Sequence, residues 1–107
     1  MGIFTTLFGK KSKVDFGALI KNGAIIIDVR TPFEYNIGHI DKSKNVPLDK
    51  LISELNKVKK DQVIITCCTS GMRSAAAKSM LKNAGFSNVH NGGSWPSLNK
   101  YLSLIHI

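Results

Sequence analysis

Apolar residues follow two alternating patterns along this chain. Continuous runs rich in β-branched residues occupy 24–29 and 63–67, and such runs are typical of strands buried on both faces of a parallel sheet. Elsewhere apolar residues recur at intervals of three and four, which predicts helices with one buried face. The side chains expected to face inward from these helices are Phe16, Leu19 and Ile20, then Leu48, Leu51, Ile52 and Leu55, then Ala77, Met80, Leu81 and Ala84, and finally Trp95, Leu98, Leu102 and Ile105.

Residues with capping chemistry mark the starts of three helices. Asp15 stands before the first helix and Ser94 before the last, and both side chains can accept a hydrogen bond from an unpaired backbone N–H. Thr31, Pro32 and Glu34 satisfy the capping box, with proline at the first helical position. A short helix is therefore expected to start there.

Glycine marks the end of the helix that opens at 74–77. This helix is expected to end at Gly85, with Phe86 placed to contact Leu81 as in a Schellman cap. The Schellman cap is a common way to pair the last carbonyl groups of a helix, so a sharp end is expected here.

Two short strands and a turn complete the predicted order of elements. The strands are expected at 45–47 and 88–90, and the glycine pair at 92–93 predicts a tight turn. Strands then alternate with helices, which favours right-handed crossovers and a parallel sheet covered on both faces. In such sheets the ligand site lies beyond the carboxyl ends of the strands.

Chain length and composition indicate the number of domains and the charge of the surface. The chain has 107 residues, of which 43% are hydrophobic, so a single domain is expected over 13–107 after a flexible tail at 1–12. The formal net charge of +8 is expected to attract anionic substrates or acidic protein partners. The lysine clusters at 10–13 and 57–60 have no interleaved aromatic residues, so a solvated surface is favoured over a nucleic-acid site.

The chain has two cysteines, and they are adjacent in the sequence. Neighbouring cysteines cannot form a disulfide framework, which favours a reducing compartment. The first residues lack the features of a secretory signal or of a membrane span. We therefore expect a cytoplasmic protein without a membrane-spanning segment.

The run 67–74, Cys-Cys-Thr-Ser-Gly-Met-Arg-Ser, follows the second buried strand and leads into a helix. Because this loop is short and rich in small residues, several unpaired backbone N–H groups are expected to converge there and to favour an anion. A helix N-terminus and a nearby arginine also stabilise a thiolate. The loop is therefore a candidate site for a reactive cysteine.

Three separated segments match one known family in their order and spacing. They are Asp-Val-Arg-Thr-Pro-Phe-Glu-Tyr at 28–35 with Gly-His-Ile at 38–40, then Asn-Val-Pro-Leu at 45–48, then the cysteine loop followed by Gly-Phe at 85–86 and by Gly-Gly at 92–93 with Trp95. Together they resemble a single-domain rhodanese over about residues 14–104. The resemblance implies a three-layer α/β/α fold with a central, mainly parallel sheet of about five strands.

The same resemblance implies sulfur transfer through Cys68. Its thiolate would take a sulfane sulfur from a small anionic donor such as thiosulfate, carry it as a persulfide, and pass it to cyanide, a thiol or a protein thiol. The residues expected to bind the substrate are Thr69, Ser70, Gly71, Met72, Arg73 and Ser74. Asp28 and Arg30 are expected to support the site as an ion pair that holds the loop, and His39 through a structural hydrogen bond.

Other kinds of site have little support in the sequence. The three histidines are scattered, and adjacent thiols do not have ordinary metal-ligand spacing, so no metal is expected. A Cys-x-x-Cys pair and a glycine-rich nucleotide motif are also absent from the sequence, and no cofactor is expected.

The distance from thiol to arginine leaves alternative interpretations open. Counted from Cys68 the loop reads Cys-x4-Arg, similar to rhodaneses, whereas counted from Cys67 it reads Cys-x5-Arg, similar to tyrosine phosphatases, and an arsenate reductase on the same scaffold is a related alternative. The placement of Gly71, and threonine rather than histidine before the first cysteine, favour Cys68 and leave Cys67 as an apolar strand residue. A non-enzymatic binding module is a further alternative, although the intact loop argues against it. Arg73 is expected either to bond neighbouring carbonyls or to steer an anionic donor.

Overall fold

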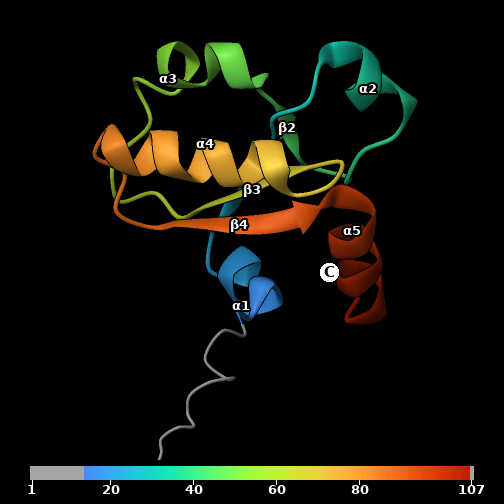
Figure 1. Ribbon diagram of the computed structural model, residues 1–107. Coiled ribbons are helices and arrows are strands. Elements are labelled where there is room, and N and C mark those ends of the chain that lie inside the picture. The colour runs from blue at the N-terminus through green and yellow to red at the C-terminus, as the bar shows by residue number, and fades with distance from the viewer. Residues whose placement is uncertain (1–13, 107) are drawn as a thin grey trace, which may run out of the picture.

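The computed structural model describes residues 14–106, so the tail expected at 1–12 lies outside the described residues. Figure 1 shows a parallel sheet whose strands lie in the order β2-β1-β3-β4. The strands are β1 (Ile25–Asp28), β2 (Lys44–Asn45), β3 (Ile64–Cys68) and β4 (Val89–Ser94). Within residues 14–106 the sheet has four strands rather than about five, because the described chain before β1 forms a helix.

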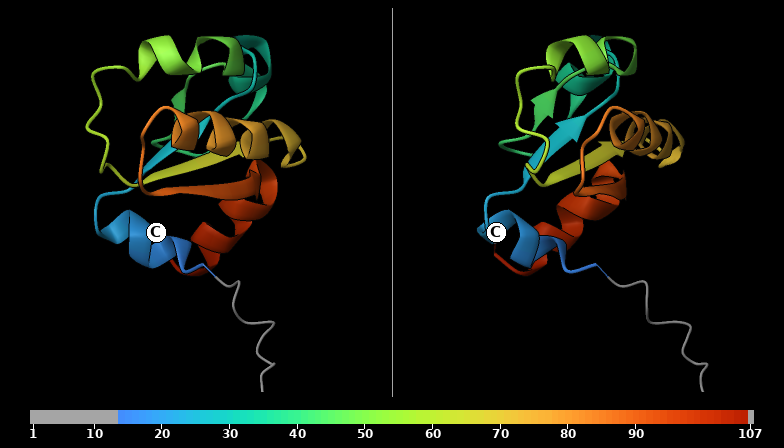
Figure 2. Two further views of the ribbon diagram at one scale, coloured as in Figure 1. Left: turned by 60° about the vertical axis from the view of Figure 1, so that its left-hand side comes forward. Right: turned by 90° about the vertical axis from the view of Figure 1, so that its left-hand side faces the viewer.

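Helices cover both faces of the sheet. They are α1 (Phe16–Lys21), α2 (Pro32–Ile37), the 3-10 turn η2 (Leu48–Lys50), α3 (Leu51–Glu54), α4 (Met72–Asn83) and α5 (Trp95–Leu104). Figures 1 and 2 show α3 and α4 on one face, and α1 and α5 on the other. The predicted three-layer α/β/α architecture is thereby confirmed. Within residues 14–106, no helix combines the length and the hydrophobicity that a bilayer crossing requires.

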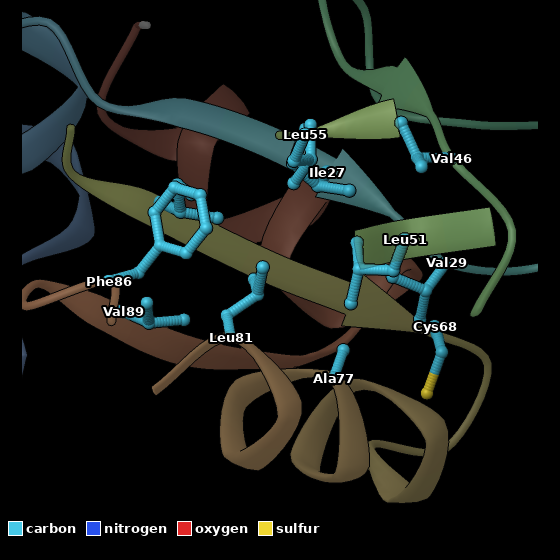
Figure 3. Packing of buried hydrophobic residues seen from close by; sticks show 11 residues of the cluster. Ile27, Val29, Val46, Leu51, Leu55, Cys68, Ala77, Leu81, Phe86 and Val89 are labelled. Carbon is cyan, nitrogen blue, oxygen red and sulfur yellow. The ribbon is translucent and has the colours of Figure 1, made fainter. Parts of the chain in front are cut away.

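Side-chain alternation along the central strands divides the core into two clusters. Ile64 and Cys68 belong to the cluster between the sheet and α3 and α4, which Figure 3 shows from close by. Ile65 and Cys67 belong to the cluster between the sheet and α1 and α5. Because successive residues of a strand point to opposite faces, the two neighbouring cysteines are separated by the sheet itself.

The predicted helix boundaries are largely confirmed. The Asp15 and Ser94 side chains cap α1 and α5, and Thr31 and Glu34 form both hydrogen bonds of the capping box at α2. At the end of α4, the backbone N–H of Phe86 donates to the carbonyl of Leu81, and the N–H of Gly85 donates to that of Lys82, each at 3.0 Å. This is the predicted Schellman pattern, with Gly85 at φ +103°.

Two boundaries around the cysteine loop differ from the prediction. Helix α4 begins at Met72 rather than at 74, because Gly71 adopts φ +95° and turns the chain into the helix as its N-cap. The glycine pair at 92–93 lies inside β4 and does not form the predicted tight turn. Between the pairs Thr66–Asn91 and Cys68–Ser94, strand β4 has one residue more than β3, so these glycines form a β-bulge.

Two side chains expected to face inward are partly exposed. Ile52 is 41% exposed, because α3 is a single turn that follows the 3-10 turn η2 and buries mainly Leu51. Ile105 is 38% exposed, since it follows the last residue of α5 and lies against the backbone at Gly17. The helical spacing therefore predicted the buried faces of these two helices correctly, but it predicted that each buried face extends further along the chain than it does.

Candidate active site

Cys67 lies at the carboxyl end of β3 on the face toward α1 and α5. Its side chain is completely buried, and its neighbours in the cluster are apolar. Burial raises the pKa of the Cys67 thiol to about 12, the negative charge of Asp28 adds to the rise, and the charge of Arg30 opposes it. Cys67 therefore packs as an apolar residue of the strand, and its raised pKa disfavours a thiolate.

The sulfur of Cys68 lies on the opposite face, against the first turn of α4 (Figure 3). It accepts hydrogen bonds from the backbone N–H of Gly71 at 3.0 Å and from that of Ser74 at 3.4 Å. The hydroxyl oxygen of Ser74 lies 3.5 Å from the sulfur. The two amide donors belong to the turn that Gly71 makes possible, so the loop and the helix start converge on one sulfur atom.

The surroundings of Cys68 favour its ionised form. Burial raises the pKa of this thiol, but hydrogen bonds from the Ser74 side chain and from the amides of Ser74, Gly71 and Ser70 outweigh burial. The pKa of Cys68 therefore lies below its ordinary value, which increases the thiolate fraction at neutral pH.

Cys68 is almost entirely covered, with 1% of its surface exposed. Thr69 and Ser70 are exposed, and Met72 is 79% exposed at the crest of the loop. In this arrangement of the loop, access from solvent to Cys68 is therefore narrow. The amides of 69–73 were all expected to surround the sulfur. The amides that donate to it in the structure are those of 70, 71 and 74.

Arg73 forms a bidentate ion pair with Glu34 rather than hydrogen bonds to neighbouring carbonyls. Its two terminal nitrogens donate to the two carboxylate oxygens of Glu34 at 2.8 and 2.9 Å. The hydrogen bonds from Arg73, and then those from Thr31, lower the pKa of Glu34 to about 2. The prediction of carbonyl partners for Arg73 was wrong, whereas steering of an anion stays a prediction.

Glu34 thus has a second role that the sequence did not reveal. The capping box with Thr31 was a sufficient explanation for a glutamate at this position. Glu34 is also 39 positions away from Arg73 in the chain, so no sequence pattern indicated that they are partners. In the structure Glu34 joins the first turn of α2 to the first turn of α4, beside the cysteine loop.

Asp28 and Arg30 form the predicted ion pair, which is buried. The closest nitrogen and oxygen atoms lie 2.7 Å apart, and the Arg30 guanidinium also lies 5.0 Å from the ring centre of Trp95. Arg30 further donates to the carbonyls of Glu34 at 3.2 Å and Gly38 at 2.7 Å. The pair therefore holds α2 rather than the cysteine loop directly, and it supports the loop through Glu34.

His39 forms the structural hydrogen bond that was expected. Its Nδ1 lies 2.7 Å from the carbonyl oxygen of Tyr35, and the two rings stack with centroids 3.7 Å apart. Both residues belong to α2 and the turn that follows it. His39 therefore stabilises this turn, at a distance from the thiol chemistry.

Two polar residues of the sheet hold the cysteine loop and were not predicted. Thr66 donates its hydroxyl proton to the carbonyl of Ser74 at 2.8 Å. The Asn91 side chain contacts Ser74 at 2.6 Å and Gly71 at 3.3 Å. Asn91 gave no signal in the sequence, because only the pairing of β4 with β3, which sets Asn91 opposite Thr66, brings it beside the loop.

Sequence comparison gives the family. A family model described as "Rhodanese-like domain" matches residues 12–96. The chain belongs to the rhodanese-like domain family. Among curated proteins it is 31% identical over 74 residues to a tRNA uridine(34) hydroxylase of Sodalis glossinidius, a match that covers 64% of this chain and 21% of the relative. It is 34% identical over 68 residues to the uncharacterized protein YqhL of Bacillus subtilis, covering 64% of this chain and 54% of YqhL.

Solved structures agree with this assignment. A rhodanese with anions from E. coli has 28% identity and a TM-score of 0.63, and the match covers 68% of this chain and 88% of that one. A rhodanese-related protein from Thermoplasma volcanium has 32% identity and a TM-score of 0.65, with 79% and 88% covered. A human single-domain sulfurtransferase, with 22% identity, a TM-score of 0.71 and coverage of 79% and 88%, supports the fold alone. This rhodanese-like chain spans about a fifth of the matched hydroxylase and about half of YqhL.

Proposed function

We propose that this rhodanese-like domain is a sulfurtransferase that moves a sulfane sulfur through a persulfide on Cys68. The observation that carries the proposal is the convergence of the Gly71 and Ser74 amides on the Cys68 sulfur. A thiolate held by such donors is a competent nucleophile. Membership of the family supports sulfur chemistry at this position.

The first half-reaction loads the cysteine. The Cys68 thiolate attacks the outer sulfur of thiosulfate or of another persulfide donor, a new S–S bond forms, and the S–S bond of the donor breaks. With thiosulfate, sulfite leaves with the electron pair of that bond. The product is a Cys68 persulfide whose negative charge lies on the outer sulfur, within reach of the amides of 69–73 once the loop opens.

The second half-reaction empties the cysteine. Cyanide or a thiolate, including a protein thiol, attacks the outer sulfur, and the Cys68 thiolate leaves with the electron pair. Cyanide yields thiocyanate, and a thiolate yields a new persulfide. The donors that lower the pKa of Cys68 also stabilise it as the leaving group, so one set of hydrogen bonds serves both steps. No cofactor enters either step, and a reducing compartment such as the cytoplasm keeps the thiol active.

The phosphatase and arsenate reductase alternatives require Cys67 as the nucleophile. Cys67 faces the α1 and α5 side of the sheet, and its pKa of about 12 keeps it protonated. The Arg73 guanidinium, which would bind two phosphate oxygens in such an enzyme, is occupied by Glu34. The intact and hydrogen-bonded Cys68 also argues against a non-enzymatic binding module.

Intact-mass spectrometry tests the proposal directly. After incubation with thiosulfate, we expect a gain of one sulfur atom, which cyanide then removes with formation of thiocyanate. The gain is expected to persist in Cys67→Ala and to disappear in Cys68→Ser. A protein that gains no sulfur from thiosulfate or from a low-molecular-weight persulfide, or one that gains it on Cys67, would contradict the proposal.

A further inference from the structure

Two backbone contacts fix which end of the Asn91 side-chain amide is the oxygen and which is the nitrogen. The N–H of Gly93 lies 2.8 Å from Oδ1, and the carbonyl of Gly71 lies 3.3 Å from Nδ2. A backbone N–H can only donate and a carbonyl can only accept, so these two contacts fix which end of the amide is the oxygen. Oδ1 therefore faces the hydroxyl oxygen of Ser74 at 2.6 Å.

The single hydroxyl proton of Ser74 must lie in that short contact. Two oxygens 2.6 Å apart need a proton between them, and the Oδ1 atom of Asn91 carries none. The carbonyl of Gly71 at 3.1 Å is a longer alternative acceptor. Toward the Cys68 sulfur, 3.5 Å away, Ser74 then presents a lone pair and accepts from the S–H group. The resting arrangement is a chain from the Cys68 thiol through the Ser74 hydroxyl to the Asn91 oxygen.

This orientation of the Ser74 hydroxyl suits the neutral thiol, whereas the amides of Gly71 and Ser74 favour the thiolate. A thiolate is an acceptor, so the lone pair of Ser74 would face a negative charge unless the hydroxyl turns its proton to the sulfur. That rotation breaks the hydrogen bond to Asn91, whose Oδ1 keeps the N–H of Gly93 as a donor. The Ser74 hydroxyl can therefore serve Asn91 or the sulfur, and not both at once.

We propose that Asn91 is a positioning residue that sets the direction of the Ser74 proton and so couples the Ser74 hydroxyl to the charge on the Cys68 sulfur. The hydroxyl points to Asn91 while the sulfur is neutral, and turns to the sulfur whenever the sulfur becomes negative. In the proposed reaction this happens before attack on the donor and again when Cys68 leaves. The role in turnover rests on the proposed function, whereas the proton coupling itself concerns the resting thiol.

The charged and titratable groups around Cys68 belong to several elements and remain unchanged in the variants below. They are the Asp28 and Arg30 pair at the end of β1, the Glu34 and Arg73 pair that joins α2 to α4, and Cys67 on the other face of β3. In β4, His90 precedes Asn91 and is opposite Ile65, and its pKa is lowered by burial and by Lys78 and Lys82 of α4. A difference between the variants therefore reports on the hydroxyl and the amide.

The experiment is a pH titration of the thiolate by its ultraviolet absorbance in the full chain. We expect Asn91→Ala to lower the pKa of Cys68 by about 0.5, the size of one net hydrogen bond, because Ser74 then donates to the thiolate without losing its best acceptor. Asn91→Ser, whose side chain is too short to reach Ser74, is a second variant with the same expected direction. Asn99→Ala, an exposed asparagine of α5, is the matched control and should leave the pKa unchanged.

A double-mutant cycle separates this role from simple support of the loop. In a Ser74→Ala background, Asn91→Ala should no longer lower the pKa of Cys68, because the hydroxyl that transmits the effect is gone. A rise of the pKa in Asn91→Ala, no change, or the same change in both backgrounds would overturn the proposal. Because the titration needs no sulfur donor, its outcome is independent of whether the chain transfers sulfur.

Discussion

Cys67 and Cys68 are adjacent in the chain and almost equally buried, yet their thiols have opposite character. Cys67 is 0% exposed and Cys68 is 1% exposed. The pKa of Cys67 rises to about 12, whereas that of Cys68 lies below its ordinary value. Burial penalises the thiolate at both positions, and at Cys67 the negative charge of Asp28 adds to the rise. At Cys68 the surrounding hydrogen-bond donors outweigh burial.

The two faces of the sheet differ because of one glycine turn. On the Cys68 face, the positive φ of Gly71 reverses the chain and directs the first amides of α4 back to the end of β3. On the Cys67 face, the neighbours are apolar side chains such as Ile65 and Leu98. The lowered pKa of Cys68 therefore depends on local hydrogen-bond donors and does not require exposure to solvent.

Replacing each cysteine in turn is expected to give the largest difference in activity between the two positions. We expect Cys68→Ser to lower the rate of thiosulfate-dependent thiocyanate formation by about three orders of magnitude or more, because the nucleophile is lost. Cys67→Ala should keep the rate within about twofold and cost roughly 1 kcal/mol of stability, through the lost buried sulfur. Steady-state kinetics and urea unfolding measure the two quantities, and equal loss of activity in both variants would contradict the distinction.

The turn at Gly71 gives the next largest effect. At φ +95°, an alanine at position 71 is expected to cost about 1 to 2 kcal/mol and to move the N–H group off the sulfur, which raises the pKa of Cys68. Gly23 has φ +101°, and a Cβ added there would meet nothing within 4 Å, so Gly23→Ala is a matched control with the same strain. Urea unfolding should give similar losses for both variants, and thiolate titration should show a raised pKa only in Gly71→Ala. A raised pKa in both would mean that general destabilisation is responsible.

The ion pair beside the loop gives the smallest effect. The pKa of Glu34 is lowered from 4.5 to about 2, so the pair stabilises the fold above about pH 4.5, and this contribution disappears as the pH falls toward 2. Glu34→Gln keeps a side chain that can form the capping box but loses the charge, so its stability should change less over this range. Urea unfolding at several pH values measures the difference. The exposed Glu54→Gln is the control, and identical pH profiles for all three proteins would contradict this role of the pair.

The local features of the fold were predictable because their causes are local. The caps at Asp15, Thr31 and Ser94 depend on residues within one helical turn, and so does the Schellman cap at Gly85. The β-bulge in β4 was not predictable, because it depends on the register between two strands that lie far apart in the sequence. The one-turn length of α3 likewise depends on packing rather than on its apolar spacing.

In the candidate site, too, features with a local cause were predictable and contacts between distant residues were not. The strand, the short loop and the helix start at 63–77 led to the amide donors around Gly71, because they lie within one short segment. The choice of Cys68 over Cys67 depended on the resemblance to the rhodanese loop. The partner of Arg73 could not be read in this way, since Glu34 had a sufficient local explanation as a cap.

The amino-acid sequence was sufficient to predict the order of strands and helices and the helix caps. That β3 extends to Cys68 and turns the two thiols to opposite faces was seen only in the structure. Only the tertiary structure decided that Glu34 binds Arg73 and that Asn91 binds Ser74, across 39 and 17 positions of the chain. The physical reason is that hydrogen bonds and ion pairs act over a few ångströms, so distant residues become partners only when the packing of strands and helices brings them together.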